Sequence, residues 1–262
     1  MSTVFTQRGE AALLPVSSRV RQALYGGADA VIALPAIWAV RDAEHFALGG
    51  VGLLSGLGCD LLSFGSEIDD LPMMLKTADL LEHPTTALHE SLHEGLSRGL
   101  SYPAALHHAV MQTSPDCAPI LASSNSTLAL CYLRQLKRLN STMRPLCIRR
   151  NSSYRSVTLD AHAYPSATAV RSCVLRGDWT AMEQSMPKES ADLLRYDALQ
   201  GRIMRQDALD SAILYRLRTM SRDEWLTLPD QKIRLNNLAF LSCHNLPYEG
   251  GGFAFAPEAD PS

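Results

Sequence analysis

The chain has 262 residues, of which 46% are apolar and 19% charged, and its net charge is −3. This composition excludes a disordered chain, because enough apolar side chains are present to build a core, and it excludes a globally basic nucleic-acid binder. Any contact with RNA would therefore have to come from a local basic patch.

The cysteines and the N-terminal residues indicate where the protein works. The six cysteines form no C-x-x-C pair, and several lie in apolar segments, as expected for reduced thiols in a core. The first residues lack the basic-then-apolar pattern of a signal peptide, and no stretch approaches about 18 uninterrupted apolar residues. We expect a cytoplasmic protein that does not span a membrane.

The first part of the chain alternates between predicted helices and strands. A helical pattern that includes Ser18 stops at the glycine pair 26–27, and residues 28–35 follow as a short apolar strand. Asp42 can cap the next helix, after which residues 60–64 form a second buried strand. Helix, strand, helix, strand implies parallel pairing, in a sheet that is covered by helices.

The middle of the chain is predicted to be a helical insertion followed by a third strand. Residues 69–112 look helical, with breaks at Pro84 and Pro103. Residues 123–125 then cap a strongly periodic helix, and residues 145–148 form the third strand candidate. Helices are expected again over residues 187–228, whereas the residues after them lose all periodicity.

Two places after the third strand favour ligand binding. Arg149 and Arg150 follow this strand at its carboxyl end, where ligands bind in open α/β sheets. Residues 166–171 then open a helix whose first backbone amides have no partner within the helix, so an anion is the natural ligand there.

A different motif, His89-Glu90-x-x-His93, matches the H-E-x-x-H pattern of zinc hydrolases. Such a helix places two imidazoles one turn apart, with the glutamate between them as a general base. A third ligand is hard to find, because Gly95 stands one position too early for the variant with a following histidine, and Glu82 and Glu94 look like surface residues. A solvated helix is therefore favoured, and a zinc hydrolase remains the distant alternative.

Short motifs of low individual specificity follow one another in a fixed order along residues 4–228. They cover residues 7–10, 27–35, 43–44, 63–67, 99–104, 124–125, 132–133, 148–150 and 166–171. The ordered set resembles the tRNA(Met) cytidine acetate ligase family, a branch of the HIGH-type nucleotidyltransferases with a Rossmann-like fold. The resemblance implies an α/β fold with a parallel sheet, and this domain organisation: a nucleotidyltransferase-like domain at 1–178 with the helical insertion at about 69–112, a helical C-terminal region at 179–228, and an irregular tail at 229–262.

The resemblance also implies an activity and its ligands. In this family ATP activates acetate as acetyl-adenylate, and the acetyl group is then transferred to the wobble cytidine of elongator tRNA(Met). ATP would be the substrate, with Mg²⁺ as a candidate cofactor and with acetate and the tRNA as partners. The oligomeric state and the catalytic residues stay open.

The family's ATP contacts match three residues here, and a phosphate-binding signature matches three more: Gly65, Asn125, Arg150, Ser166, Thr168 and Arg171. A glycine after a strand lets a nucleotide approach the backbone, and an arginine offers a fork to phosphate. Ordinary roles are the alternative for each of them, namely a turn glycine, helix caps and solvated basic residues.

One expected motif is missing. The family's H-x-[GN]-H sequence, whose histidines would stabilise charge that develops on the phosphates, is absent from the 262 residues. Residues 1–5 correspond to the end of the family's second strand, so we expect the first βα unit and the usual C-terminal part to be missing and this form to be inactive. A non-catalytic nucleotide- or RNA-binding remnant is the alternative. A local basic patch is a further hypothesis, with solvated surface charge as its alternative: Lys137, Arg138, Arg149, Arg150 and Arg155.

Overall fold

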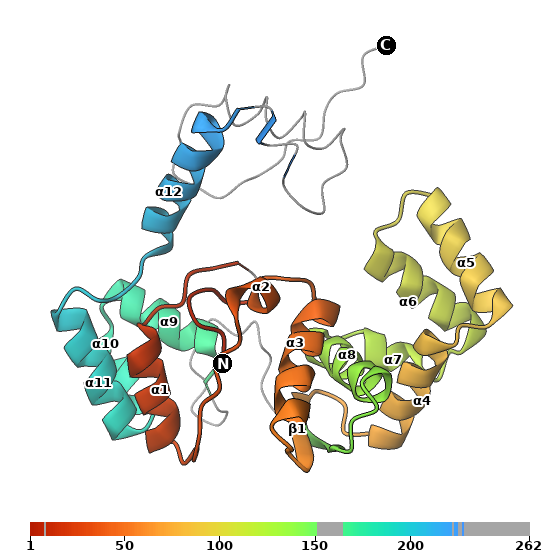
Figure 1. Cartoon of the computed structure of the whole chain (residues 1–262), viewed down its shortest axis with the longest axis horizontal. Coiled ribbons are helices and arrows are strands. Elements are labelled where there is room, and N and C mark those ends of the chain that lie inside the picture. Colours follow the sequence, from red (N-terminus) through yellow and green to blue (C-terminus); the bar gives the residue numbers. More distant parts are fainter. Residues whose placement is uncertain (8, 151–164, 222, 225–226, 228–262) are drawn as a thin grey trace. The chain divides into compact units, whose positions relative to one another are not determined.

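The computed structural model describes residues 1–7, 9–150, 165–221, 223–224 and 227. The chain forms two compact units, Met1–Arg202 and Ile203–Ser262 (Figure 1). The domain boundaries expected at residues 178 and 228 stay predictions, and the expected tail at 229–262 lies outside the described residues.

Helices make up most of the described chain. They are α1 (Val16–Tyr25), α2 (Ala36–Ala39), α3 (Ala43–Gly56), α4 (Leu71–Glu82), α5 (Thr86–Ser97), α6 (Tyr102–Thr113), α7 (Ala118–Leu121), α8 (Ser124–Arg138), α9 (Ala167–Arg176), α10 (Trp179–Gln184), α11 (Lys188–Leu199) and α12 (Gln206–Thr219). None of the described helices has the length and apolar character that crossing a bilayer requires.

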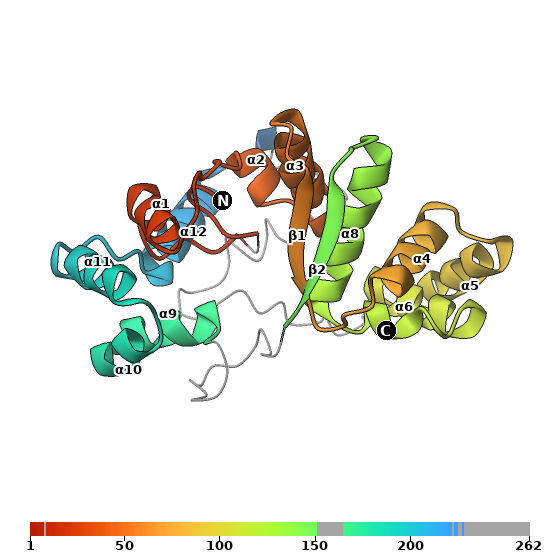
Figure 2. The same ribbon diagram turned by 90° about the horizontal axis from the view of Figure 1, so that it is seen from below.

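Two parallel strands, β1 (Leu61–Ser66) and β2 (Arg144–Arg149), form the sheet of the first unit. Leu61 lies opposite Arg144, and the register continues to Ser66 opposite Arg149. Helices α3 and α8 lie together behind the two strands in Figure 2. The expected α/β fold with a parallel sheet is therefore confirmed.

The strands are only half buried, which corrects the expectation of buried strands. Along β1, Leu62 and Phe64 are buried whereas Leu61 is exposed, and in β2 both Leu146 and Ile148 are exposed. Successive side chains of a strand point to opposite faces, and α3 and α8 cover one of them. One core cluster therefore lies where the sheet meets these two helices and α4, and a second includes buried residues of α5, α6 and α7.

The prediction of a strand at residues 28–35 is wrong for most of that run. Only Leu34 takes part in β structure, through an isolated parallel bridge to Ser2, and its N–H donates to the carbonyl of Met1 at 2.8 Å. An apolar run becomes a strand only where a neighbouring strand accepts and donates along its whole length. Here residues 1–2 are the neighbour, and Met1 exchanges backbone hydrogen bonds with this run only at Ile32 and Leu34.

Helix caps were predicted more accurately than strands, because a cap needs only local partners. The Asp42 carboxylate accepts from the backbone N–H of His45 at 3.0 Å and begins α3. Ser123 and Ser166 cap α8 and α9 in the same way. The cap at Asp42 is thus confirmed, and Ser123 is the capping residue of the 123–125 run, whereas Asn125 lies inside the first turn of α8. Ser166 takes the cap role that was the alternative to phosphate binding.

The helices predicted over residues 69–112 are confirmed as α4, α5 and α6, and their being an insertion stays a prediction. Pro84 lies between α4 and α5, as expected for a residue that cannot continue a helix, whereas Pro103 stands in the first turn of α6, where it is tolerated. Helices α5 and α6 pack closely at Gly95. A Cβ atom added there would stand only 3.0 Å from the Cβ of Ala105, so the missing side chain permits the close approach.

Candidate functional site

A cavity of about 400 Å³ lies beside β1, in the first unit. Side chains from α3 and α8 form much of its wall, together with the N-terminal residues and the segment around Leu34. The lining residues are Met1, Ser2, Ile32, Leu34, Phe46, Gly50, Val51, Leu53, Leu54, Leu62, Ser63, Phe64, Gly65, Asn125, Leu128, Tyr132 and Arg150. The wall is mostly apolar and has a few polar groups, as small-molecule sites usually do.

Three of the residues singled out from the sequence line this cavity together. Gly65 lies near the carboxyl end of β1, Arg150 directly follows β2, and Asn125 stands in the first turn of α8. The two strands are parallel, so their carboxyl ends meet at one edge of the sheet, and α8 begins at that edge. Three positions distant in the sequence therefore face one space.

The Arg150 side chain lies against Gly65. A Cβ atom at Gly65 would stand only 3.0 Å from both Cγ and Cδ of Arg150. The Arg150 backbone N–H donates to the carbonyl of Ser66 at 2.8 Å, which fixes where the side chain starts. The missing side chain at Gly65 thus makes room for the arginine in this structure.

The guanidinium of Arg150 is incompletely satisfied. Its Nε is buried and has no hydrogen-bond partner in the described part of the chain. A buried N–H of a charged group is costly to leave unpaired, and a guanidinium pairs best with phosphate or carboxylate oxygens. The cavity therefore presents a ready contact for an anionic group of a ligand.

Glu67, which the sequence analysis did not single out as a site residue, anchors a cluster next to the cavity. Its Oε2 accepts from the hydroxyl of Ser123 at 2.7 Å, and its Oε1 accepts from Nδ2 of Asn125 at 2.6 Å. The Ser126 hydroxyl lies 3.4 Å from the same carboxylate and shares a hydrogen bond of 2.7 Å with the buried hydroxyl of Ser66. The only local signal was a carboxylate at the end of a strand, within the 63–67 motif.

The carboxyl of Glu67 is ionised at neutral pH. Burial tends to raise its pKa, but the hydrogen bonds from Ser123 and Asn125 outweigh burial and hold the pKa below its ordinary value of 4.5. A negative charge therefore sits beside Asn125 and is stabilised by neutral donors.

The other three predicted residues lie at the start of α9, away from the cavity lining. The Ser166 hydroxyl accepts from the N–H of Ala169 at 3.0 Å, Thr168 is half-buried, and Nη1 of Arg171 lies 3.5 Å from a carboxylate oxygen of Glu10. The structure thus brings Gly65, Asn125 and Arg150 together and does not place the α9 residues among them. The phosphate-binding role of α9 stays a prediction.

The H-E-x-x-H residues do not gather a metal site. His89, Glu90 and His93 are exposed on α5. Across the described residues, no group of three His, Cys, Asp or Glu side chains is arranged to hold a metal ion.

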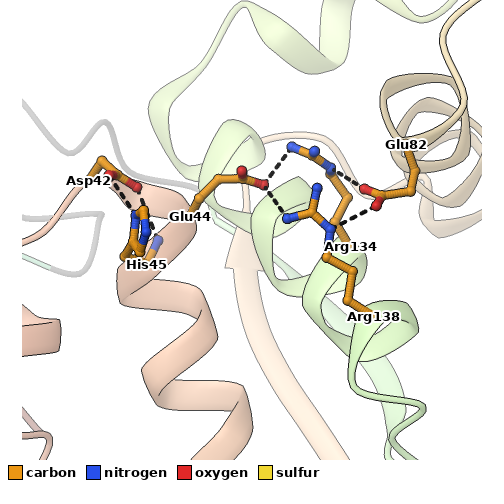
Figure 3. A network of polar contacts seen from close by, with 6 residues as sticks. All are labelled: Asp42, Glu44, His45, Glu82, Arg134 and Arg138. Carbon is orange, nitrogen blue, oxygen red and sulfur yellow. Dashed lines mark hydrogen bonds and ion pairs between the residues drawn. The ribbon is translucent and has the colours of Figure 1, made fainter.

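Part of the predicted basic patch is neutralised by acidic partners. Nζ of Lys137 lies 2.7 Å from a carboxylate oxygen of Asp79, and Nε of Arg138 lies 2.7 Å from one of Glu82 (Figure 3 shows the Arg138 contact). Arg155 lies outside the described residues. Lys137 and Arg138 therefore serve as ion-paired surface groups.

The fold and the cavity define a class of protein. A parallel α/β sheet with polar side chains converging at its carboxyl edge is the arrangement of nucleotide-binding α/β proteins. Within this class, the family model described as HIGH Nucleotidyl Transferase matches residues 1–244, and the chain belongs to that family.

Curated relatives and solved structures give a closer comparison. The chain is 35% identical over 203 residues to the tRNA(Met) cytidine acetate ligase of Caldicellulosiruptor bescii, covering 77% of this chain and 50% of that protein. It is 33% identical over 233 residues to the ligase of the same name from Kosmotoga olearia, covering 86% and 55%. The chain therefore spans about half the length of the curated relatives it matches.

Two crystal structures of Thermotoga maritima TmcAL share its fold at 26% sequence identity. The one bound with alpha-thio ATP has a TM-score of 0.82 and is matched over 94% of this chain and 62% of that chain. The apo form has a TM-score of 0.88, with 94% and 60% covered.

Proposed function

We propose that this chain functions as an ATP-dependent acetate ligase that acetylates the wobble cytidine of elongator tRNA(Met). ATP would bind at the carboxyl edge of the sheet. The observation that carries the proposal is the convergence of Gly65, Asn125 and Arg150 on one cavity. The identity to tRNA(Met) cytidine acetate ligases and the similarity to a structure bound with alpha-thio ATP support it. The same proposal includes a tRNA substrate and a cytoplasmic location.

The cavity residues suit distinct parts of the nucleotide. The buried Nε of Arg150 would pair with a phosphate oxygen, and Asn125 would hold the ribose or the base. A ligand that covers the mostly apolar wall would displace water from it, which strengthens each polar contact in the site. In this proposal Ser166, Thr168 and Arg171 offer the opening turn of α9 to the remaining phosphates.

Acetate would be activated by attack of its carboxylate oxygen on the α-phosphorus of ATP, with pyrophosphate as the leaving group. The resulting mixed anhydride is the acetyl-adenylate, and the N4 amine of the tRNA cytidine would then take the acetyl group and release AMP. Arg150 would stabilise negative charge that develops on the phosphates during the first step. Mg²⁺ fits as a companion of the triphosphate, because this cation keeps most of its waters and binds phosphate oxygens, so it requires no cluster of protein carboxylates.

A second candidate is a nucleotide- or RNA-binding protein without catalysis. The cavity lined by Gly65, Asn125 and Arg150 would serve nucleotide binding without chemistry equally well. In that case the chain would bind ATP and would not form acetyl-adenylate.

Two measurements on the chain separate these functions. Calorimetry reports ATP binding, and the acetate-dependent exchange of pyrophosphate into ATP reports adenylate formation. Exchange would establish the ligase chemistry for this chain alone, whereas ATP binding without exchange would favour the non-catalytic role. Absence of ATP binding would contradict the ligase and the nucleotide-binding form of the second candidate, and only the RNA-binding form would be left.

A further inference from the structure

The two ends of the Asn125 amide are not equivalent in this structure. Its Nδ2 donates to Oε1 of Glu67 at 2.6 Å. No other described residue donates a hydrogen bond to its carbonyl oxygen Oδ1, while the side chain lines the cavity. The amide is therefore tethered through its donor end.

The direction of this tether follows from the chemistry of Glu67. An ionised carboxylate only accepts hydrogen bonds, so the amide group that approaches it must be the NH₂. The hydrogen bonds that lower the pKa of Glu67 keep it ionised at neutral pH. Asn125 cannot turn its carbonyl toward Glu67 without bringing two acceptors together.

Glu67 is itself held in place by several neighbours. Ser123 donates to it at 2.7 Å and also caps α8, while Ser126 donates at 3.4 Å and shares a hydrogen bond with Ser66. Among the described residues no lysine or arginine pairs with this carboxylate, which sets it apart from the other partly buried acids of α3 and α4. The carboxylate of Glu67 therefore does not neutralise a described lysine or arginine. Its effect is to orient the neutral groups that donate to it, among them the Asn125 amide.

We infer that Glu67 is a positioning residue that fixes the Asn125 amide with its carbonyl oxygen available to the ligand, so that the cavity selects a ligand that presents a hydrogen-bond donor at this point. This inference rests on the proposed function and deepens it. In ATP two groups are such donors, the ribose hydroxyls and the exocyclic amine of adenine. A phosphate oxygen is an acceptor and is disfavoured there.

The donor is identified by comparing nucleotides that each lack one of these groups. ITP replaces the exocyclic amine with a carbonyl, and 2′-deoxy-ATP and 3′-deoxy-ATP each lack one hydroxyl. We expect the wild-type chain to bind one of them about tenfold more weakly than ATP, because a single hydrogen bond is lost. The analogue with the reduced affinity shows whether the base or the ribose donates the hydrogen bond to the carbonyl oxygen of Asn125.

Glu67→Gln tests the positioning role. The glutamine keeps the shape but can donate, so Asn125 is free to reverse its amide. We expect affinity for ATP to fall about tenfold and affinity for the deficient analogue to stay within about twofold, so that discrimination between the two is lost. A purely structural role would lower the affinities for both nucleotides together.

Two further variants complete the experiment. Glu94→Gln is the matched control, because Glu94 is an exposed carboxylate on α5 that pairs with Arg98 at 2.6 Å, and it should leave discrimination unchanged. If Glu67→Gln does not fold, Glu67→Asp keeps the charge and withdraws it from the amide by one methylene, with the same expected loss of discrimination.

The failures of the two proposals are distinguishable. If the wild-type chain binds no ATP, the proposed function fails and this inference fails with it. If the wild-type chain binds ATP and the folded Glu67 variant discriminates as the wild type does, only the role of Glu67 is overturned.

Discussion

Helix α8 carries a polar cluster at each end, and the two are built differently. At its N-terminal end, Glu67 takes hydrogen bonds from Ser123 and Asn125 and has no described cationic partner. At its C-terminal end, Arg134 and Arg138 lie between Glu44 of α3 and Glu82 of α4 (Figure 3). The first cluster borders the cavity, and the second joins three helices.

The difference lies in how the charges are matched. Arg134 contacts Glu44 at 2.7 Å and Glu82 at 3.0 Å, and Arg138 contacts Glu82 at 2.7 Å, so each acid already faces two guanidinium groups. At the other end, the carbonyl of Asn125 and the Nε of Arg150 have no such partners among the described residues. Matched charges indicate a structural role, and polar atoms left open beside a cavity indicate ligand binding.

The largest effect is expected from Arg150→Ala. Removing the guanidinium removes a charge-assisted hydrogen bond to phosphate, which is worth about 1.5–3 kcal/mol, or roughly a 10- to 150-fold loss of ATP affinity. Stability should not fall, because the buried Nε has no described partner to lose. Calorimetry with ATP measures the first effect and thermal unfolding the second.

The neighbouring arginine provides the control. Arg149 is exposed and does not line the cavity, so Arg149→Ala should leave ATP affinity within about twofold. Equal losses in the two variants would show that general positive charge attracts the nucleotide, and the contrast between the two clusters would lose its functional meaning.

Glu82→Gln is expected to do the reverse, lowering stability and sparing ATP affinity. Glu82 is only 20% exposed and pairs with Arg134, which is 17% exposed, so the network is better shielded than a surface pair. We expect a loss of about 1–2 kcal/mol in the free energy of unfolding, above the range for isolated surface pairs. Urea denaturation at pH 7 measures this loss, and a change in ATP affinity would contradict the structural role.

The same variant should change the pH dependence of stability. The hydrogen bond from Arg138 lowers the pKa of Glu82, against the opposing effect of burial and with help from Arg134. A lowered folded-state pKa stabilises the protein above the ordinary value of 4.5, and this stabilisation is lost as the pH falls through the folded-state value. The stability difference between wild type and Glu82→Gln should therefore be full at pH 6 and shrink below about pH 4.

A smaller effect on binding is expected from Gly65→Ala. The added Cβ would stand 3.0 Å from Cγ and Cδ of Arg150, and the flexible side chain must move by a few tenths of an ångström to accept it. We expect ATP affinity to fall about three- to fivefold, roughly 1 kcal/mol, through the displaced guanidinium. In the Arg150→Ala background the added methyl should have no such effect, and an equal loss there would mean that Gly65 acts on the ligand directly.

Several features of this comparison were predictable from the sequence because they depend on local partners. The caps Ser123 and Asp42 and the strand that ends at Arg149 follow from residue type and periodicity. Glu67 was missed because its partners stand 56 and 58 residues away, and no local pattern encodes that pairing. The run at 28–35 was misassigned for a related reason, since a strand exists only where another strand completes its hydrogen bonds.

The smallest effect is expected where an ion pair lies in open solvent. Lys137 and Asp79 are in contact at 2.7 Å, but their side chains are 43% and 59% exposed, so water and salt screen their attraction. Lys137→Ala should lower the midpoint of thermal unfolding only slightly at low salt, and this small effect should disappear near 1 M salt. The Glu82 network should keep most of its contribution under the same conditions, because its partners are less exposed. If salt weakened the Glu82 network as much as the Lys137–Asp79 pair, the lower exposure of the network would not distinguish it from an ordinary surface ion pair.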